Sequence, residues 1–346
     1  MPLKAPPIFC ELKKLVKSNE LVCDTIPMNK NLLGIDIGGT MIKGALFNNI
    51  GSMIAKAEVP TGGDKGVDHF IENIIALVGT LTKNSPAVGA LGVGIAGLLD
   101  RERRILLESP NLPLLNNLPL KEHLTSRLQM PVFIENDANL AALGERWVGD
   151  GRDIQNFLLF TLGTGIGGGL ILNGKLWTGD IGKAGEFGHV IVEPGGAQCG
   201  CGKLGCLEAY SSGSAMVRIA REALADGRTS SLKVIYDRNP EDITPKTIYI
   251  EARNGDALCN NIFHEAARYL AQAISNVNNL LDIHTFIIGG GVSKASEIFH
   301  AGLMQEVQNR VFSLSKDKIN IIISRLGNDA GVYGAGYLAM QGISEA

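Results

Sequence analysis

Short apolar runs separated by glycine or asparagine turns begin at Leu32. The first three runs, at residues 32–39, 41–48 and 52–60, predict strands joined as antiparallel hairpins. The elements expected after them are a helix over roughly Val67–Thr82, a buried strand at 88–95, an irregular segment at 109–119, a strand at 131–135 and a helix after Asn136. The first half is therefore predicted to be three strands followed by alternating helix and strand.

The second half of the chain repeats this order of elements. The expected strands lie at residues 157–163, 165–172, 174–179, 284–290 and 319–324, with helices after Glu208, Asp256 and Ser293. Asp256 can cap an amphipathic run, and the pair Thr244 and Pro245 is typical of a helix start. Two copies of one α/β unit are the simplest account. The final apolar helix, at 332–340, is expected to cross back and pack on the first copy.

Length and charge limit the number of domains and the kind of partner. A chain of 346 residues exceeds the length at which one hydrophobic core usually stops growing, so two domains with a cleft between them are expected. Residues 1–31 include Pro2, Pro6 and Pro7 and have no apolar run, which predicts a flexible extension. A net charge of −3 gives no basic stripe for nucleic acid or membrane, so a small molecule is the expected partner. The most apolar runs, 87–99 and 157–172, are too short or too rich in glycine to predict membrane spans.

Residues 186–208 concentrate three cysteines and one histidine. The sulfurs of Cys199, Cys201 and Cys206 and one ring nitrogen of His189 would complete the Cys₃His set of a structural zinc site. A disulfide is the alternative, but one residue separates the first two cysteines and three thiols leave one unpaired. Two further alternatives are that this loop of three cysteines, the cysteine knuckle, is reduced and holds no metal, or that it holds a metal other than zinc. Because nothing resembles a secretory leader, the thiols are expected to be reduced in a cytoplasmic protein.

Glycines, 43 in all, cluster in loops that follow apolar strands. After Asp36 the chain turns at Gly38, Gly39 and Thr40, with Lys43 close by, so that backbone N–H groups and a hydroxyl can converge on an anionic oxygen. An ordinary hairpin is the alternative for this loop. Two later loops also place a glycine-rich turn after an apolar strand. One contains Gly163, Thr164, Gly165, Gly167 and Gly168, and the other contains Gly289, Gly290 and Gly291. Their spacing matches neither a P-loop nor a dinucleotide fingerprint.

The glycine loops and the run GH…CxCGxxGCxE together resemble the ROK family of bacterial sugar kinases and repressors, and within it the ATP-dependent glucokinases, over about residues 32–340. The resemblance implies an α/β fold, the duplicated actin/hexokinase-like (ribonuclease H-like) two-domain ATPase fold with an interdomain cleft. It implies a small domain of residues 32–136 plus 330–346 and a large domain of residues 137–329 that carries the zinc loop. It also implies a homo-oligomer, a dimer or a tetramer.

Roles for single residues are implied by the same resemblance. The loops at 36–43 and 163–168 would bind the phosphates of ATP, and Gly290 and Gly291 would lie near the adenosine. The residues expected to contact the sugar are Asn111, Asn136, Asp137, Glu186, His189 and Glu208. For Asn111 the alternative role is that of a turn residue ahead of Pro113. Zinc would bind one ring nitrogen of His189 and leave the other as a directed hydrogen-bond donor.

Phosphoryl transfer to a sugar hydroxyl needs in-line positioning, Mg²⁺ and a carboxylate that receives the hydroxyl proton. Asp137 is predicted to be this general base, because it lies between a strand and a helix in the segment NDANLAALGE, which resembles the catalytic segment of the ROK family. A helix cap is the alternative for an aspartate or asparagine at this place. Asp36 is expected to be the carboxylate near Mg²⁺, and its alternative role is a hydrogen bond to its own turn.

The leading expectation is a kinase that transfers the γ-phosphoryl group of ATP to the 6-hydroxyl of glucose. Fructose, mannose and N-acetylmannosamine are alternative hexoses, because the chain departs from the family pattern at Ala96, Leu114, Leu115 and Lys183. A sugar-responsive ROK repressor is a further alternative. The 31 residues ahead of the first strand are short for a DNA-reading module, which counts against it.

Overall fold

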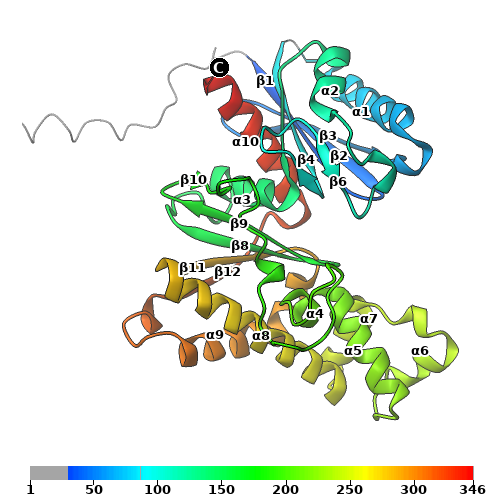
Figure 1. Cartoon of the computed structure of the whole chain (residues 1–346), viewed down its shortest axis with the longest axis vertical. Coiled ribbons are helices and arrows are strands. Elements are labelled where there is room, and N and C mark those ends of the chain that lie inside the picture. The colour runs from blue at the N-terminus through cyan, green and yellow to red at the C-terminus, as the bar shows by residue number, and fades with distance from the viewer. Residues whose placement is uncertain (1–29, 86, 346) are drawn as a thin grey trace, which may run out of the picture.

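The computed structural model describes residues 30–85 and 87–345, which form two five-stranded β-sheets flanked by helices (Figure 1). The predicted flexible extension, residues 1–31, lies almost entirely outside the described residues. None of the helices in these two ranges combines the length and apolar character that crossing a membrane requires.

The first sheet has five strands in the order β3-β2-β1-β4-β7. Its first three strands pair antiparallel, whereas β4 runs parallel to β1 and β7 parallel to β4. The edge strand β3 alternates half-buried and exposed residues, as expected of a strand with one covered face. The bounds are β1 Asn31–Ile37, β2 Met41–Phe47, β3 Met53–Pro60, β4 Val88–Ile95 and β7 Val132–Asn136.

The second sheet repeats the same arrangement in the order β10-β9-β8-β11-β12. Again the first three strands pair antiparallel, whereas β11 runs parallel to β8 and β12 parallel to β11. The bounds are β8 Phe157–Leu162, β9 Ile166–Leu172, β10 Lys175–Leu176, β11 Thr285–Gly289 and β12 Asn320–Ile323. The predicted duplication of one α/β unit is therefore confirmed.

Helices cover the outer face of each sheet. On the first sheet, α1 (Val67–Thr82) and α2 (Leu120–Leu128) bury apolar residues against β1, β2, β4 and β7. A larger apolar core lies beneath the second sheet, where α8 (Ala257–Leu281) and α9 (Ser296–Arg310) are the main elements. The other helices of this half are α4 Glu208–Ser211, α5 Gly213–Ala225, α6 Lys233–Arg238 and α7 Pro245–Arg253. Asp256 and Thr244 cap α8 and α7, as predicted.

Two helices lie between the sheets and cross at close range (Figure 1). The helix α3 (Asp137–Trp147) packs on the second sheet, and α10 (Ala330–Glu345) packs on the first. A Cβ at Gly334 would lie 1.7 Å from the carbonyl oxygen of Leu140, so the contact requires glycine. The last helix thus returns to the first sheet, as expected.

Local structure differs from the prediction in the second half. The helix expected after Glu208 lasts only four residues, because the chain extends at Ser212, whose side chain caps the separate helix α5. The strand expected at 174–179 is reduced to Lys175–Leu176. The helix expected from Ser293 begins as a 3₁₀ turn, η5 (Val292–Ala295).

A small hairpin in the first half was not predicted. It consists of β5 (Leu98–Leu99) and β6 (Leu106–Glu108). Its second strand forms an antiparallel bridge with Leu118, within the segment that leads to α2. The remaining short 3₁₀ turns are η1 Gly63–Lys65, η2 Pro113–Leu115, η3 Phe187–His189, η4 Pro240–Asp242, η6 Lys316–Lys318 and η7 Gly327–Asp329.

Candidate active site

A pocket of about 250 Å³ opens between the two sheets at the crossing of α3 and α10. Both halves of the chain contribute to it. Its lining consists of Asp36, Lys43, Asp137, Ala138, Ala141, Leu159, Thr161, Gly289, Gly290, Ser324, Gly327, Asn328, Ala330 and Gly331. The strand ends and helix starts of both copies therefore meet at one cavity, as is usual for ligand sites in α/β sheets.

Two carboxylates share this pocket, one from each end of the first half. Burial raises the pKa of Asp36 to about 7, with a further rise from the charge of Asp137 and an opposing effect of Lys43. Burial also raises the pKa of Asp137, and the nearby charge of Glu186 adds to the rise, while backbone N–H groups oppose it. Close, partly desolvated carboxylates of this kind are typical of sites that bind cations or move protons.

Helix capping at the start of α3 is carried out by Asn136. Its side-chain oxygen accepts the N–H groups of Ala138 at 2.9 Å and Asn139 at 3.3 Å. Its amide nitrogen lies 3.5 Å from the carbonyl oxygen of Gly97. The capping role weighed for the carboxylate of Asp137 thus belongs to its neighbour.

The first glycine turn joins β1 to β2 at the edge of the pocket. The N–H of Gly38 donates to the carbonyl of Met41 at 3.0 Å, so this group closes the hairpin. A Cβ at Gly39 would lie 3.2 Å from the Cβ of Asn111, which brings the predicted sugar residue beside the turn. Lys43 reaches across to the other half, where its Nζ lies 3.4 Å from the carbonyl oxygen of Asn328.

The second glycine loop joins β8 to β9 and does not line the pocket. Gly163 and Gly165 close a turn through a 2.9 Å backbone hydrogen bond. Gly167 and Gly168 lie within β9, where a Cβ would meet Ala138 at 2.7 Å and Phe187 at 2.8 Å. Close packing therefore explains why these two positions of β9 have no side chain. Thr164 accepts the N–H of Ser214 through its carbonyl at 3.3 Å.

The third loop, after β11, does reach the pocket through Gly289 and Gly290. Gly290 has a φ of 85°, and a Cβ there would lie 2.4 Å from the carbonyl oxygen of Leu162. Only glycine fits such a conformation at this distance. Gly291, the next residue, is outside the lining.

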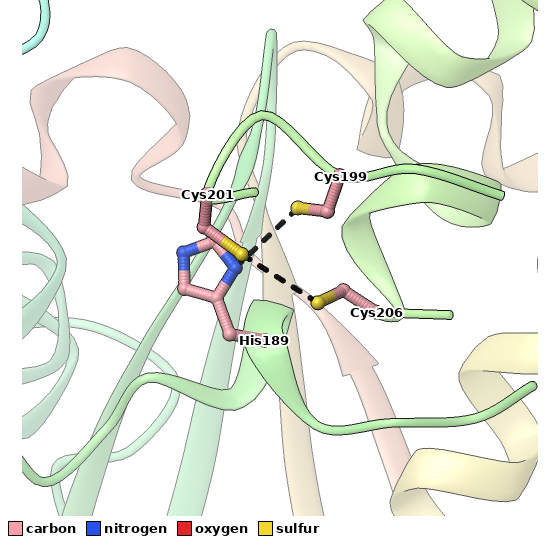
Figure 2. Close-up of side chains that lie close together, drawn as sticks. All are labelled: His189, Cys199, Cys201 and Cys206. Carbon is pink, nitrogen blue, oxygen red and sulfur yellow. Dashed lines mark hydrogen bonds between the residues drawn. The ribbon is translucent and has the colours of Figure 1, made fainter. Parts of the chain in front are cut away.

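The four predicted zinc ligands converge. Ligand atoms of His189, Cys199, Cys201 and Cys206 all lie within 4.8 Å of one another, and Figure 2 shows their side chains directed to a common centre. Sγ of Cys199 lies 3.7 Å from Nδ1 of His189, and the sulfurs of Cys201 and Cys206 are also 3.7 Å apart. Two sulfurs at 2.3 Å from a tetrahedral Zn²⁺ are separated by about 3.8 Å. The four described cysteines form no disulfide.

The second nitrogen of His189 faces Glu186, one of the residues predicted to contact the sugar. Its Nε2 lies 4.0 Å from a carboxylate oxygen of Glu186. Glu208 lies on the other side of the knuckle, where one carboxylate oxygen accepts the N–H of Ile166 at 2.8 Å and the other lies 3.5 Å from Sγ of Cys199. Glu208 thus ties the cysteine knuckle to the second glycine loop.

Sequence reasoning missed several polar residues of the pocket, among them Thr161 and Ser324. The hydroxyl of Ser324 donates to the buried carboxylate of Glu145, which also accepts the N–H of Asp150 at 2.8 Å. Neither residue lies in a glycine motif. Thr161 is at the place in β8 that Asp36 has in β1, so alignment of the two copies was the available signal.

Comparisons with known proteins find relatives that match this chain over most of its length. The chain is 38% identical over 315 residues to a protein named Glucokinase from Halalkalibacterium halodurans, covering 89% of this chain and 94% of that protein. It is 33% identical over 310 residues to N-acetylmannosamine kinase from Salmonella typhi, with coverage of 89% and 97%.

Among solved structures, a ROK family glucokinase from Streptomyces griseus in complex with glucose and AMPPNP matches with a TM-score of 0.77 and 35% identity, over 90% of this chain and 99% of that chain. The predicted actin/hexokinase-like fold is therefore confirmed. The family model described as "ROK family" matches residues 32–342. The chain belongs to the ROK family.

Proposed function

We propose that this protein is an ATP-dependent kinase that phosphorylates the 6-hydroxyl of glucose. The observation that carries the proposal is the likeness over nearly the whole chain to glucokinases, one of them seen with glucose and AMPPNP. The pocket between the sheets supports it, since it joins a helix-start carboxylate from one half to a glycine turn from the other.

Asp137 is the proposed general base. Asn136 caps α3, which leaves the carboxylate of Asp137 at the pocket wall. Burial raises its pKa above the usual range of an aspartate, and a carboxylate with a raised pKa accepts a proton more readily. The sugar would bind with its 6-hydroxyl on this carboxylate, positioned by Asn111, Glu186 and His189.

The nucleotide is proposed to bind in the same pocket. Lys43 would leave the carbonyl of Asn328 and bind a phosphate oxygen instead. Gly290, which has no side chain, would let the adenosine lie close to the backbone. The two turns at 38–40 and 163–165 lie outside the lining of this pocket and would contact phosphates that extend beyond it. Mg²⁺, when bound, would neutralise charge that develops on the transferred group, and Asp36 would be the carboxylate that holds it, through water.

The Cys₃His cluster is proposed to hold structural Zn²⁺. The 3.7 Å separations between ligand atoms support this metal. Burial raises the pKa of the Cys199 thiol to about 12, so this sulfur needs a bound cation to become a thiolate at neutral pH. Coordination through Nδ1 of His189 would leave Nε2–H to donate to the sugar or to Glu186. With four protein ligands the ion has no open position for catalysis.

Three finer features complete the proposal. Reduced cysteines suit a cytoplasmic enzyme. A homodimer or homotetramer is expected from the family resemblance. N-acetylmannosamine is the second candidate substrate, because a relative named for it is 33% identical.

The test is ADP release measured with purified protein, MgATP and single sugars. Glucose is expected to give the highest kcat/KM among glucose, mannose, fructose and N-acetylmannosamine. A higher value for N-acetylmannosamine would transfer the assignment to that sugar. The absence of stimulation by any of the four would overturn the kinase proposal.

A further inference from the structure

Arg103 is held in an unusual backbone conformation in the turn of the β5–β6 hairpin. Its φ is 55°, in the left-handed region that residues with a Cβ rarely adopt. The carboxylate of Asp100 fixes this turn by accepting the N–H groups of Arg104 at 2.6 Å and Ile105 at 2.7 Å. The turn therefore directs the Arg103 side chain inward from a rigid base.

On the first half of the molecule, Arg103 pairs with Glu135. Its Nε lies 2.9 Å from Oε2 of Glu135, and the two side chains are only 17% and 6% exposed. The other oxygen of Glu135 accepts the N–H of Asn136 at 2.8 Å and Nδ2 of Asn139 at 3.0 Å. Arg103 is thus connected to the junction of β7 and α3 that presents Asp137.

The same guanidinium also contacts the second half. Its Nη2 donates to the carbonyl oxygen of Gly182 at 3.1 Å, in the loop between β10 and η3. A Cβ at Gly182 would lie 2.7 Å from Nη1, so glycine lets the guanidinium rest against the backbone. Glu186 follows four residues later in this loop. The planar fork of arginine can serve both partners at once, whereas a lysine ammonium is a single point charge.

We propose that Arg103 is a positioning residue that holds the loop of residues 177–186 against the β7–α3 junction and so fixes the spacing between Glu186 and Asp137. It acts through Glu135 on one side and Gly182 on the other. The inference rests on the proposed sugar-kinase function, because this spacing matters only if both carboxylates act on one sugar.

Steady-state kinetics of the full chain test the proposal. Arg103→Ala is expected to raise the KM for glucose about tenfold and to lower kcat about tenfold, because the variant loses both charge-assisted contacts, to Glu135 and to Gly182, that hold the loop. The KM for ATP is expected to change by less than about twofold, because neither Arg103 nor Gly182 lines the pocket in which the nucleotide is proposed to bind. The matched control is Arg104→Ala, whose side chain is 54% exposed, and it should leave all three constants unchanged.

Two further variants separate positioning from stability. Arg103→Lys keeps a positive charge beside Glu135 and is expected to retain Tm near that of the wild type, but to keep the raised glucose KM because Gly182 loses its partner. Gly182→Ala displaces the guanidinium from the loop side and should raise the glucose KM without adding to the effect of Arg103→Ala in the double variant. If Arg103→Ala does not fold, the glucose KM values of Arg103→Lys and Gly182→Ala test the positioning role by themselves.

The outcomes that overturn the inference are distinct from failure of the proposed function. An unchanged glucose KM in Arg103→Ala would overturn it, and so would an Arg103→Lys variant that recovers glucose KM together with Tm. A wild-type protein that releases no ADP with any hexose would instead overturn the kinase proposal.

Discussion

The two halves of the molecule share one strand order but place different chemistry at equivalent positions. Asp36 lies near the end of β1 opposite Gly94, and Thr161 lies near the end of β8 opposite Gly289. Both side chains line the same pocket, yet only one is ionisable. The residue that begins α3, directly after β7, is Asp137.

The corresponding helix of the second half begins without a buried carboxylate. A 3₁₀ turn at Gly327–Asp329 leads into α10, and Asp329 forms a surface ion pair with Lys56 at 2.6 Å. The two copies of the α/β unit therefore share a strand arrangement around one cavity but differ in the side chains that they place there. In the pocket lining, the first copy provides the two carboxylates, Asp36 and Asp137, while the second provides glycines and hydroxyls. The cysteine knuckle, with Glu186 and Glu208 beside it, also belongs to the second copy.

The largest effect is expected from exchanging the carboxylates that begin the two helices. Asp137→Asn should lower kcat by roughly 10³-fold or more, with glucose affinity nearly unchanged, because the amide keeps the shape but cannot accept the proton. Asp329→Asn, the matched change in the second half, should alter kcat by less than about twofold. Steady-state kinetics and calorimetric titration of glucose measure both. Equal losses of kcat in the two variants would show that the aspartates at the starts of the two helices do not differ in role.

The cysteine knuckle belongs to the second half alone. Cys206→Ser is expected to abolish bound zinc and lower Tm by roughly 10 °C, with faster amide exchange across residues 186–212 and not in β1 or β4. Cys259→Ser removes another buried cysteine, outside the cluster, and should keep full metal content. Elemental analysis and hydrogen exchange distinguish the two. A metal-free wild-type protein would contradict the zinc proposal.

The contrast between Asp36 and Thr161 predicts a dependence of stability on pH. Burial raises the pKa of Asp36 from 3.8 to about 7, so the folded protein retains a proton that the unfolded chain releases above about pH 4. The free energy of unfolding should therefore fall by roughly 4 kcal/mol as pH rises from about 4 to 7, and this contribution should be constant above that. Denaturant titrations of the ligand-free protein should show a flatter profile for Asp36→Asn than for wild type. Thr161→Val should keep the wild-type slope, and a slope unaffected by Asp36→Asn would show that other groups cause it.

The smallest predicted effect concerns the crossing that joins the halves. Gly334→Ala places a Cβ against the backbone of Leu140 and should lower the free energy of unfolding by about 1–3 kcal/mol. Gly79→Ala, in α1 with open space around it, should raise that free energy by about 0.5–1 kcal/mol. Equilibrium unfolding of both variants measures the difference. A neutral Gly334→Ala would mean that the two helices can separate without cost.

Much of the fold was predictable because strands and long helices have periodic patterns. The helix over Val67–Thr82 and the capped helix after Asp256 were found in this way. The break in the helix at Ser212 was not predicted, because apolar and small residues continue through it. The Ser212 side chain accepts the N–H of Ala215 and so starts α5 separately from α4. A tertiary contact overrides the helix propensity at this point: the N–H of Gly213 donates to the carbonyl of Gly163 at 2.8 Å.

The candidate site was predictable where its residues are close in sequence. The spacing of Cys199, Cys201 and Cys206 was sufficient to predict the cluster. Arg103 and Ser324 carry no motif, and their partners lie 32 and 179 residues away, so only the folded chain brings them to the site. Which of two adjacent polar residues caps α3 also depended on the backbone angles of Asn136.

Product analysis by ³¹P NMR tests the central claim most directly, with wild type and Asp137→Asn incubated in parallel with glucose and MgATP. The account predicts that wild type converts ATP to ADP and a phosphomonoester whose resonance is split into a triplet by the two hydrogens of C6, while the variant leaves ATP intact on the same timescale. A doublet from another carbon, inorganic phosphate in place of an ester, or equal conversion by the variant would contradict it.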